Sequence, residues 1–203
     1  SSPSVVAARR LSALIGGATV GATFLLGRKL RGMALGVLAG LLLATSPSHI
    51  VVASHVAWSA SLAPLLAVLT TFFFLKALKD NQPINWLFTG LLAGLAVQAH
   101  PMTLLAVVVA PLLYLIYARP REGMAKGLSL AFAGFIVGYV NMLVFNLVVQ
   151  PLGSIKAAVE AYWTGVSKPL TLSAYVKRLS SLSWIYASSL CLTVPSTAPR
   201  VLI

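Results

Sequence analysis

Side chains that could perform acid–base catalysis are few in this chain. Only three of its 203 residues are acidic, namely Asp80, Glu122 and Glu160. Asp80 and Glu122 lie in short basic junctions, and Glu160 lies on the polar face of a predicted amphipathic helix. General acid–base catalysis by carboxylates needs them to share a site. The spacing offers no such pair, and we expect no catalytic carboxylate within this chain.

Three histidines and one cysteine complete the set of reactive side chains. His49, His55 and His100 have no carboxylate or thiolate neighbours at metal-ligand spacing, so we expect hydrogen bonding at helix ends rather than metal binding. No cofactor is predicted, and a requirement for a divalent metal is left undefined. Cys191 has no partner for an internal disulfide. Phosphate-loop, nucleophile-elbow and hydride-transfer motifs are absent, which excludes the common soluble enzyme classes.

The composition is that of a membrane protein. Apolar residues make up 59% of the chain and charged residues 9%, and the mean hydropathy is +0.93. One bilayer crossing takes about 20 residues. We therefore predict an all-α, polytopic transmembrane helix bundle of about seven spans. The apolar runs that define it are 11–26, 33–53, 59–78, 84–99, 102–118, 127–149 and 182–194.

The net charge of +12 comes largely from Lys and Arg clusters at every second junction. Clusters at 28–31, 76–79 and 119–126 alternate with junctions 46–58 and 98–101, which contain neither residue. Such alternation indicates a cytoplasmic position for the clusters, next to membrane lipid head groups. Nucleic acid is therefore not the expected partner. In this orientation residues 1–10 and all three histidines are extracytoplasmic.

Arg9 and Arg10 depart from this charge pattern, because they precede the first span on the extracytoplasmic side. A guanidinium group binds phosphate through two parallel hydrogen bonds, which lysine cannot reproduce. The pair is thus a candidate phosphate site near the outer leaflet. The alternative is that both side chains only extend from the helix end toward water.

Recurring small residues predict where helices touch. Glycines stand four residues apart, at 17 and 21, at 32, 36 and 40, at 90 and 94, and at 134 and 138. In a bilayer such spacing lets helix backbones approach closely. We expect these glycines to lie on helix contact faces.

The pattern changes after Pro151. Apolar residues repeat at helical spacing from Ile155 to Val166 and again from Leu172 to Leu182, opposite polar faces. We predict two amphipathic helices at the outer membrane interface, or alternatively two loop helices packed on the bundle. The organisation is then a six-span core at 1–149, an extracytoplasmic amphipathic loop at 150–181 and a candidate seventh span at 182–203.

Five short motifs together resemble a known family. They are Ala-Ala-Arg-Arg-Leu-Ser-Ala-Leu at 7–14, Leu-Leu-Gly-Arg-Lys-Leu-Arg-Gly at 25–32, Ser-Pro-Ser-His-Ile at 46–50, Ser-His-Val-Ala-Trp at 54–58 and Gln-Ala-His-Pro at 98–101. Their order and spacing resemble the C-type, polyprenyl-phosphate-dependent membrane glycosyltransferases of glycosyltransferase family 39. The resemblance covers roughly residues 5–150. It is greatest to the bacterial branch related to protein mannosyltransferases and the lipid A aminoarabinose transferase.

The resemblance implies a multi-pass enzyme of a bacterial or archaeal cell membrane. Such an enzyme transfers a hexosyl or pentosyl group from a polyprenyl-phosphate-linked donor to a glycan, lipid or protein acceptor at the extracytoplasmic face. The family's principal catalytic Asp lies in an outer loop that would precede Ser1. We therefore expect an N-terminally truncated fragment that is inactive alone.

Site residues are carried over only where the motifs match. Arg9 and Arg10 become candidates for contacting the donor phosphate, and His55 and Trp58 candidates for lining the cavity. His49 and His100 are weaker candidates. Many relatives carry Arg and an acidic residue after the Ser-Pro-x-His turn, whereas this chain has His55 and the hydroxyls of 59–61.

Two other functions remain open at the level of sequence. Glycine-rich helices also suit a small-molecule or lipid transporter, although no inverted internal repeat is found. A non-catalytic membrane subunit could instead hold a partner through its glycine faces.

Overall fold

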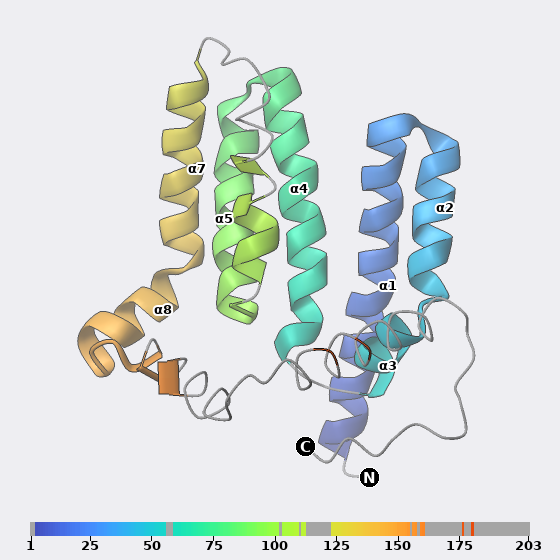
Figure 1. The fold of residues 1–203 in the computed structure, drawn as a ribbon, viewed down its shortest axis with the longest axis horizontal. Coiled ribbons are helices and arrows are strands. Elements are labelled where there is room, and N and C mark those ends of the chain that lie inside the picture. Colours follow the sequence, from blue (N-terminus) through green and yellow to red (C-terminus); the bar gives the residue numbers. More distant parts are fainter. Residues whose placement is uncertain are drawn as a thin grey trace.

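The computed structural model describes residues 3–55, 59–101, 103–109, 111–112 and 123–154, together with 156–157, 159–160, 176 and 180. Over these residues the chain forms helices and short turns, without a strand (Figure 1). The predicted all-α class is therefore confirmed for the described part of the chain. The two amphipathic helices and the candidate seventh span fall largely or wholly outside it.

Helices α1 (Pro3–Arg31) and α2 (Met33–Ala44) form an antiparallel hairpin. The turn is made by Gly32, whose φ of 86° is one that residues with a Cβ rarely adopt. The hairpin closes tightly below the turn, since a Cβ on Gly36 would lie 2.8 Å from the Phe24 carbonyl oxygen. This turn carries the first basic cluster.

Helix α3 (Pro47–His55) follows α2 after a short break. The sequence predicted one continuous span over 33–53, whereas the structure divides this stretch into two helices. Thr45 ends α2, with its backbone N–H donating to the Leu41 carbonyl, and Pro47 begins α3. Proline cannot donate the backbone hydrogen bond that would continue a helix, so the run is divided there.

A second group of helices begins with the 3-10 turn η1 (Ser59–Leu62) and α4 (Ala63–Asp80). Asn81, with φ 47°, ends α4, and Pro83 begins α5 (Pro83–Ala99). The turn is fastened by Trp86, whose indole Nε1–H donates to Asn81 Oδ1 at 3.2 Å. Trp86 is 2% exposed and packs on Phe74 of α4, so the hairpin is anchored beside the second basic cluster.

Helix α7 (Met124–Gly138) lies along α5 (Figure 1). Cβ atoms on Gly90 and Gly94 would collide with α7 backbone atoms, and those on Gly134 and Gly138 with α5 backbone atoms. The predicted contact face is therefore confirmed for these four glycines. The prediction that Gly17 and Gly21 of α1 also lie on a contact face is wrong within the described structure, because an added Cβ on either would have no described atom within 4 Å.

Apolar length alone is a poor guide to the number of membrane spans here. By length and composition, one described helix could cross a membrane, Val5–Arg31 within α1. A second span is possible if α7 is joined with the stretch that follows it, which consists of α8 (Val140–Val144) and the π-helical η3 (Phe145–Val149). The chain bends by 63° between α7 and this stretch. Helices α2 and α5 are shorter apolar helices. The predicted number of about seven spans is not confirmed.

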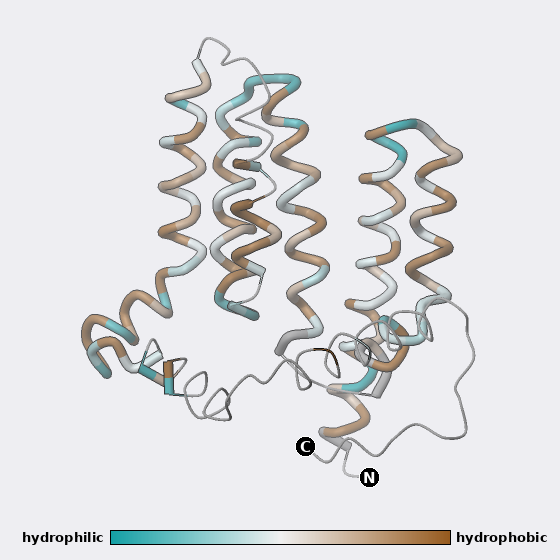
Figure 2. The backbone as a smooth tube through the Cα atoms, viewed as in Figure 1, coloured by the Kyte–Doolittle hydropathy of each residue, from teal (hydrophilic) through white to brown (hydrophobic). Residues whose placement is uncertain are grey.

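Large apolar side chains cover much of the helix surface. Leu14 is 72% exposed, Phe132 66% and Leu147 72%. Such extended exposure of apolar side chains is unfavourable in water and is typical of surfaces that contact lipid. Hydrophilic residues gather instead toward the ends of the helices (Figure 2). The core divides into an aromatic cluster around Phe74 and Trp86 and an aliphatic cluster around Leu66 and Val97.

Candidate functional site

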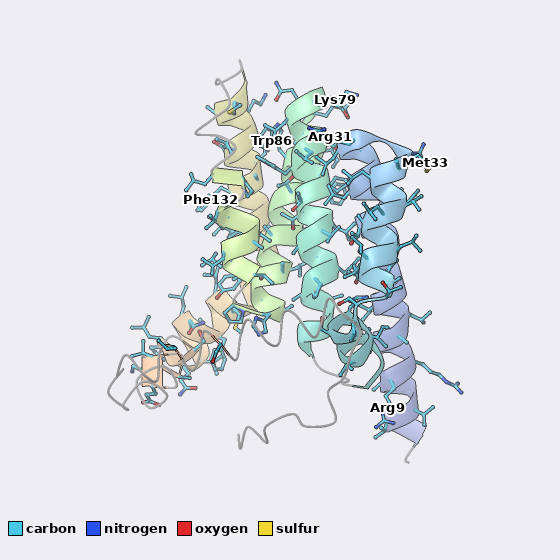
Figure 3. The ribbon with its side chains drawn as sticks, turned by 45° about the vertical axis from the view of Figure 1, so that its right-hand side comes forward. Arg9, Arg31, Met33, Lys79, Trp86 and Phe132 are labelled. Carbon is cyan, nitrogen blue, oxygen red and sulfur yellow. The ribbon has the colours of Figure 1, made fainter. Side chains whose placement is uncertain are left out.

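The two ends of the described helices differ in charge. The α1–α2 turn, the α4–α5 turn and the start of α7 lie at one end, and all three bear basic residues (Figure 1). Arg31 and Lys79 lie at this end and Arg9 at the other (Figure 3). Lys29 Nζ stands 5.2 Å from the centre of the Phe72 ring, which links α1 to α4. The basic junctions are thus brought together, and we call this the basic end.

A cavity of about 480 Å³ lies toward the opposite end. Three elements enclose it: the first half of α1, the turn η1 with the start of α4, and the last turns of α5. Its apolar wall includes Leu11 and Ile15 of α1 and Leu66 of α4. Cavities of this size hold small molecules when a few polar groups are fixed within an apolar wall.

The polar groups that the structure describes in this cavity are uncharged. Ser12 of α1 is 5% exposed and Ser61 of η1 is 9% exposed. Gln98, from the last turn of α5, also lines the cavity, and its Oε1 is buried without a hydrogen-bond partner. No Lys, Arg, His, Asp or Glu stands among the described residues of the lining. The described wall therefore offers hydrogen-bonding groups and apolar contacts to an uncharged part of a ligand.

Arg9 and Arg10 lie at the cavity's end of α1, next to the lining residue Ala8. Both are exposed, and neither lines the cavity. Around the helix axis Arg9 lies about 60° and Arg10 about 160° from Ser12, so Arg10 projects away from the face that lines the cavity. Whether they contact a donor phosphate remains a prediction.

His49 joins α3 to α1. Its Nε2 lies 3.2 Å from the Gly16 carbonyl oxygen, and Gly16 is buried so closely against Ala53 of α3 that no Cβ fits there. Since a carbonyl oxygen can only accept, the bond requires a proton on Nε2. That proton removes Nε2 as a metal ligand. The residue has the hydrogen-bonding role expected at a helix end.

The other aromatic candidates are partly outside the described structure. His100 ends α5 in an extended conformation, with φ −157° and ψ 117°, and its carbonyl oxygen accepts from Thr103 Oγ1 at 2.7 Å. His55 is the last residue of α3, and its side chain is not among those described. Trp58 lies outside the described residues. Within the described part of the chain, no three His, Cys, Asp or Glu residues are grouped to hold a metal ion.

Sequence reasoning missed the three polar residues of the cavity as a group. Ser12 falls inside an apolar run, and Gln98 ends another. Their one signal is that a polar residue interrupting an apolar span tends to face the bundle interior rather than lipid. That signal does not say which helices meet there.

A second cavity, of about 380 Å³, lies between α5, α7 and the π-helical η2 (Leu105–Val109). Trp86, Ala93, Val107 and Phe132 are among its lining residues. Its described wall is almost wholly apolar, so it offers no chemistry of its own.

Comparison with known protein families gives a match over most of the chain. A family model described as dolichyl-phosphate-mannose-protein mannosyltransferase matches residues 2–148, which is more than half of the chain. No curated protein and no solved structure matches significantly. The matched region contains the described helices from α1 to α8 and the described residues that line the neutral cavity.

Proposed function

The chain belongs to the dolichyl-phosphate-mannose-protein mannosyltransferase family, a family of membrane-integral glycosyltransferases, and we propose that it acts on a polyprenyl-phosphate-linked sugar. In this proposal the sugar passes to an acceptor hydroxyl at the extracytoplasmic face. The family match carries the proposal. The neutral cavity supports it by offering a largely apolar pocket with three polar side chains, away from the basic end of the bundle.

The reaction would be a displacement at the anomeric carbon of the donor. The acceptor oxygen forms a new bond to that carbon, and the bond from the carbon to the phosphate oxygen breaks. The phosphate leaves with the electron pair, and a base takes the acceptor proton. Cations near the departing phosphate lower the barrier by stabilising the charge that develops on it.

Arg9 and Arg10 are the residues that we propose for this phosphate. They are exposed at the end of α1 that borders the cavity. A sugar in the cavity would leave its phosphate near the mouth, where the guanidinium groups could bind it in bidentate fashion. The separation of a neutral cavity from an exposed cationic pair fits a ligand with a neutral ring and an anionic linkage.

The base is not found among the described residues of the cavity, none of which is acidic. We propose that the base lies outside the described cavity wall. The present chain then supplies the sugar pocket and the phosphate contacts.

The direct test is sugar transfer by the natural gene product, translated from its own start codon and reconstituted in lipid vesicles. Radiolabelled dolichyl-phosphate-mannose and its undecaprenyl counterpart serve as donors. We expect label to move from the lipid phosphate to a water-soluble or protein-bound product, with release of polyprenyl phosphate. If the protein neither transfers the sugar nor binds either donor, the proposal is disproved. Sugar counterflow without transfer would favour a transporter instead.

A further inference from the structure

Among the described residues, two buried side-chain atoms have no hydrogen-bond partner, Asn85 Nδ2 and Gln98 Oε1, and of these two residues Gln98 lines the cavity. The backbone of its helix makes its own hydrogen bonds, and the buried threonines of the bundle donate to carbonyls four residues earlier, as Thr70 does to Leu66 at 2.8 Å. Gln98 Oε1 accepts no such bond. A buried acceptor without a donor destabilises the folded protein. An unused acceptor in a cavity wall is available to a ligand that brings a donor.

The surroundings of Gln98 limit the chemistry of that ligand. The described cavity wall is aliphatic with two hydroxyls, from Ser12 and Ser61, and bears no charge. A phosphate or an amine would be desolvated there without compensation. A hydroxylated ring has the opposite character, with C–H surfaces for the aliphatic wall and O–H groups for an amide oxygen.

We infer that the cavity binds the sugar ring of the lipid-linked donor and that Gln98 selects for one of its hydroxyls. This inference rests on the proposed function and adds to it a specificity-determining residue. The Oε1 atom is itself screened from solvent, so the ligand reaches it after the terminal amide turns about χ3, a torsion with broad minima. The hydroxyl then donates to Oε1 and supplies the missing hydrogen bond.

The test is a comparison of Gln98→Met with Gln82→Met, two variants at opposite ends of α5. Gln82 is exposed at the basic end and makes no capping hydrogen bond through its side chain. Binding of dolichyl-phosphate-mannose and of its 2-, 3-, 4- and 6-deoxy forms is measured with the natural gene product in nanodiscs. We expect one deoxy donor to bind about tenfold more weakly than the parent, and Gln98→Met to abolish that difference. Gln82→Met should preserve it.

A second measurement separates ligand recognition from a structural role. Gln98→Met removes an unpartnered buried oxygen, so we expect the midpoint of thermal unfolding without ligand to rise while donor binding weakens. A lower midpoint together with unchanged selectivity would mean that Gln98 only supports the fold, and the inference would be overturned. Equal binding of all deoxy donors by the wild type would also overturn the inference about Gln98. If the wild type still transferred the sugar in that case, the proposed function would stand. Loss of both binding and transfer would remove the proposed function itself.

Discussion

At the scale of single residues, polar side chains in this protein fall into two classes. Buried hydroxyls of Thr19, Thr70 and Thr89 donate to backbone carbonyls of their own helices at 2.7–2.8 Å, and so they need no ligand. The side chains of Gln98 and His49 are not described as bonding to a carbonyl of their own helix. Gln98 lines a cavity, and its Oε1 accepts no hydrogen bond, whereas His49 donates from Nε2 to the Gly16 carbonyl of α1. The first is therefore assigned to recognition and the second to packing.

For His49 we expect a stability effect and no effect on metal dependence. His49→Ala removes the donor to the Gly16 carbonyl and should lower the free energy of unfolding by about 0.6 kcal/mol, a usual value for hydrogen bonds between membrane helices. His49→Gln keeps an N–H donor and should lose less. Thermal unfolding in detergent, with and without a chelator, measures both. A chelator effect that disappears in His49→Ala would instead point to a metal ligand.

For the arginine pair we expect an effect on donor binding that depends on salt. Arg9→Gln combined with Arg10→Gln should weaken dolichyl-phosphate-mannose binding about tenfold, because two charge-assisted contacts to phosphate are lost. Arg28→Gln combined with Arg31→Gln, at the basic end of the same helix, removes the same charge and should change donor binding little. The wild-type advantage should shrink as salt is raised, since exposed charges are screened. Equal effects of the two double substitutions would show that only overall charge matters.

At the scale of elements, the closest packing occurs where glycines of two helices face each other. Gly90 and Gly94 of α5 meet the backbone of α7, and Gly134 and Gly138 of α7 meet the backbone of α5. The resulting pair positions the last turn of α5, and with it Gln98. Glycine spacing alone did not separate these positions from Gly17 and Gly21, which are exposed in α1.

This packing makes Gly94 far more sensitive than Gly21 to the same substitution. Gly94→Val would drive side-chain atoms into the Phe135 carbonyl oxygen and the Gly138 backbone, and it should cost about 1–3 kcal/mol of stability or more. Gly21→Val adds a side chain on an open helix face and should be nearly neutral. The two midpoints of thermal unfolding in one detergent provide the comparison. Similar losses in both variants would contradict the assignment of the contact face.

At the scale of the whole molecule, the two ends of the described helices carry different functional groups. One end gathers Lys and Arg from three junctions, and the other holds the neutral cavity with Arg9 and Arg10 beside it. In a membrane, lysine- and arginine-rich loops remain on the cytoplasmic side. The cavity would then open toward the extracytoplasmic side, where the proposed acceptor is found.

Cysteine labelling tests this orientation. In a Cys191→Ser background, Lys79→Cys should react with a membrane-impermeant maleimide in inside-out vesicles but not in intact cells. Arg10→Cys should show the reverse behaviour. Both residues are exposed at opposite ends of the described helices, so accessibility within the fold does not separate them. Labelling of Lys79→Cys in intact cells would invert the proposed topology.

Properties that depend on neighbours along the chain could be read from the sequence. Apolar composition predicted helices, clustered charges predicted a basic end, and motif order predicted the family that the comparison confirms. The lengths of the elements were predicted less well, because Pro47 divides one apolar run and a 63° bend after Gly138 divides another.

Only the tertiary structure decided which of these residues meet. The cavity joins Ser12, Ser61 and Gln98, which are separated by tens of residues in the chain and come from three different elements. Helical periodicity fixes which residues of one helix share a face, but it carries no information about the neighbour that covers that face. The unpartnered oxygen of Gln98 could therefore be recognised only after the helices around it had been placed.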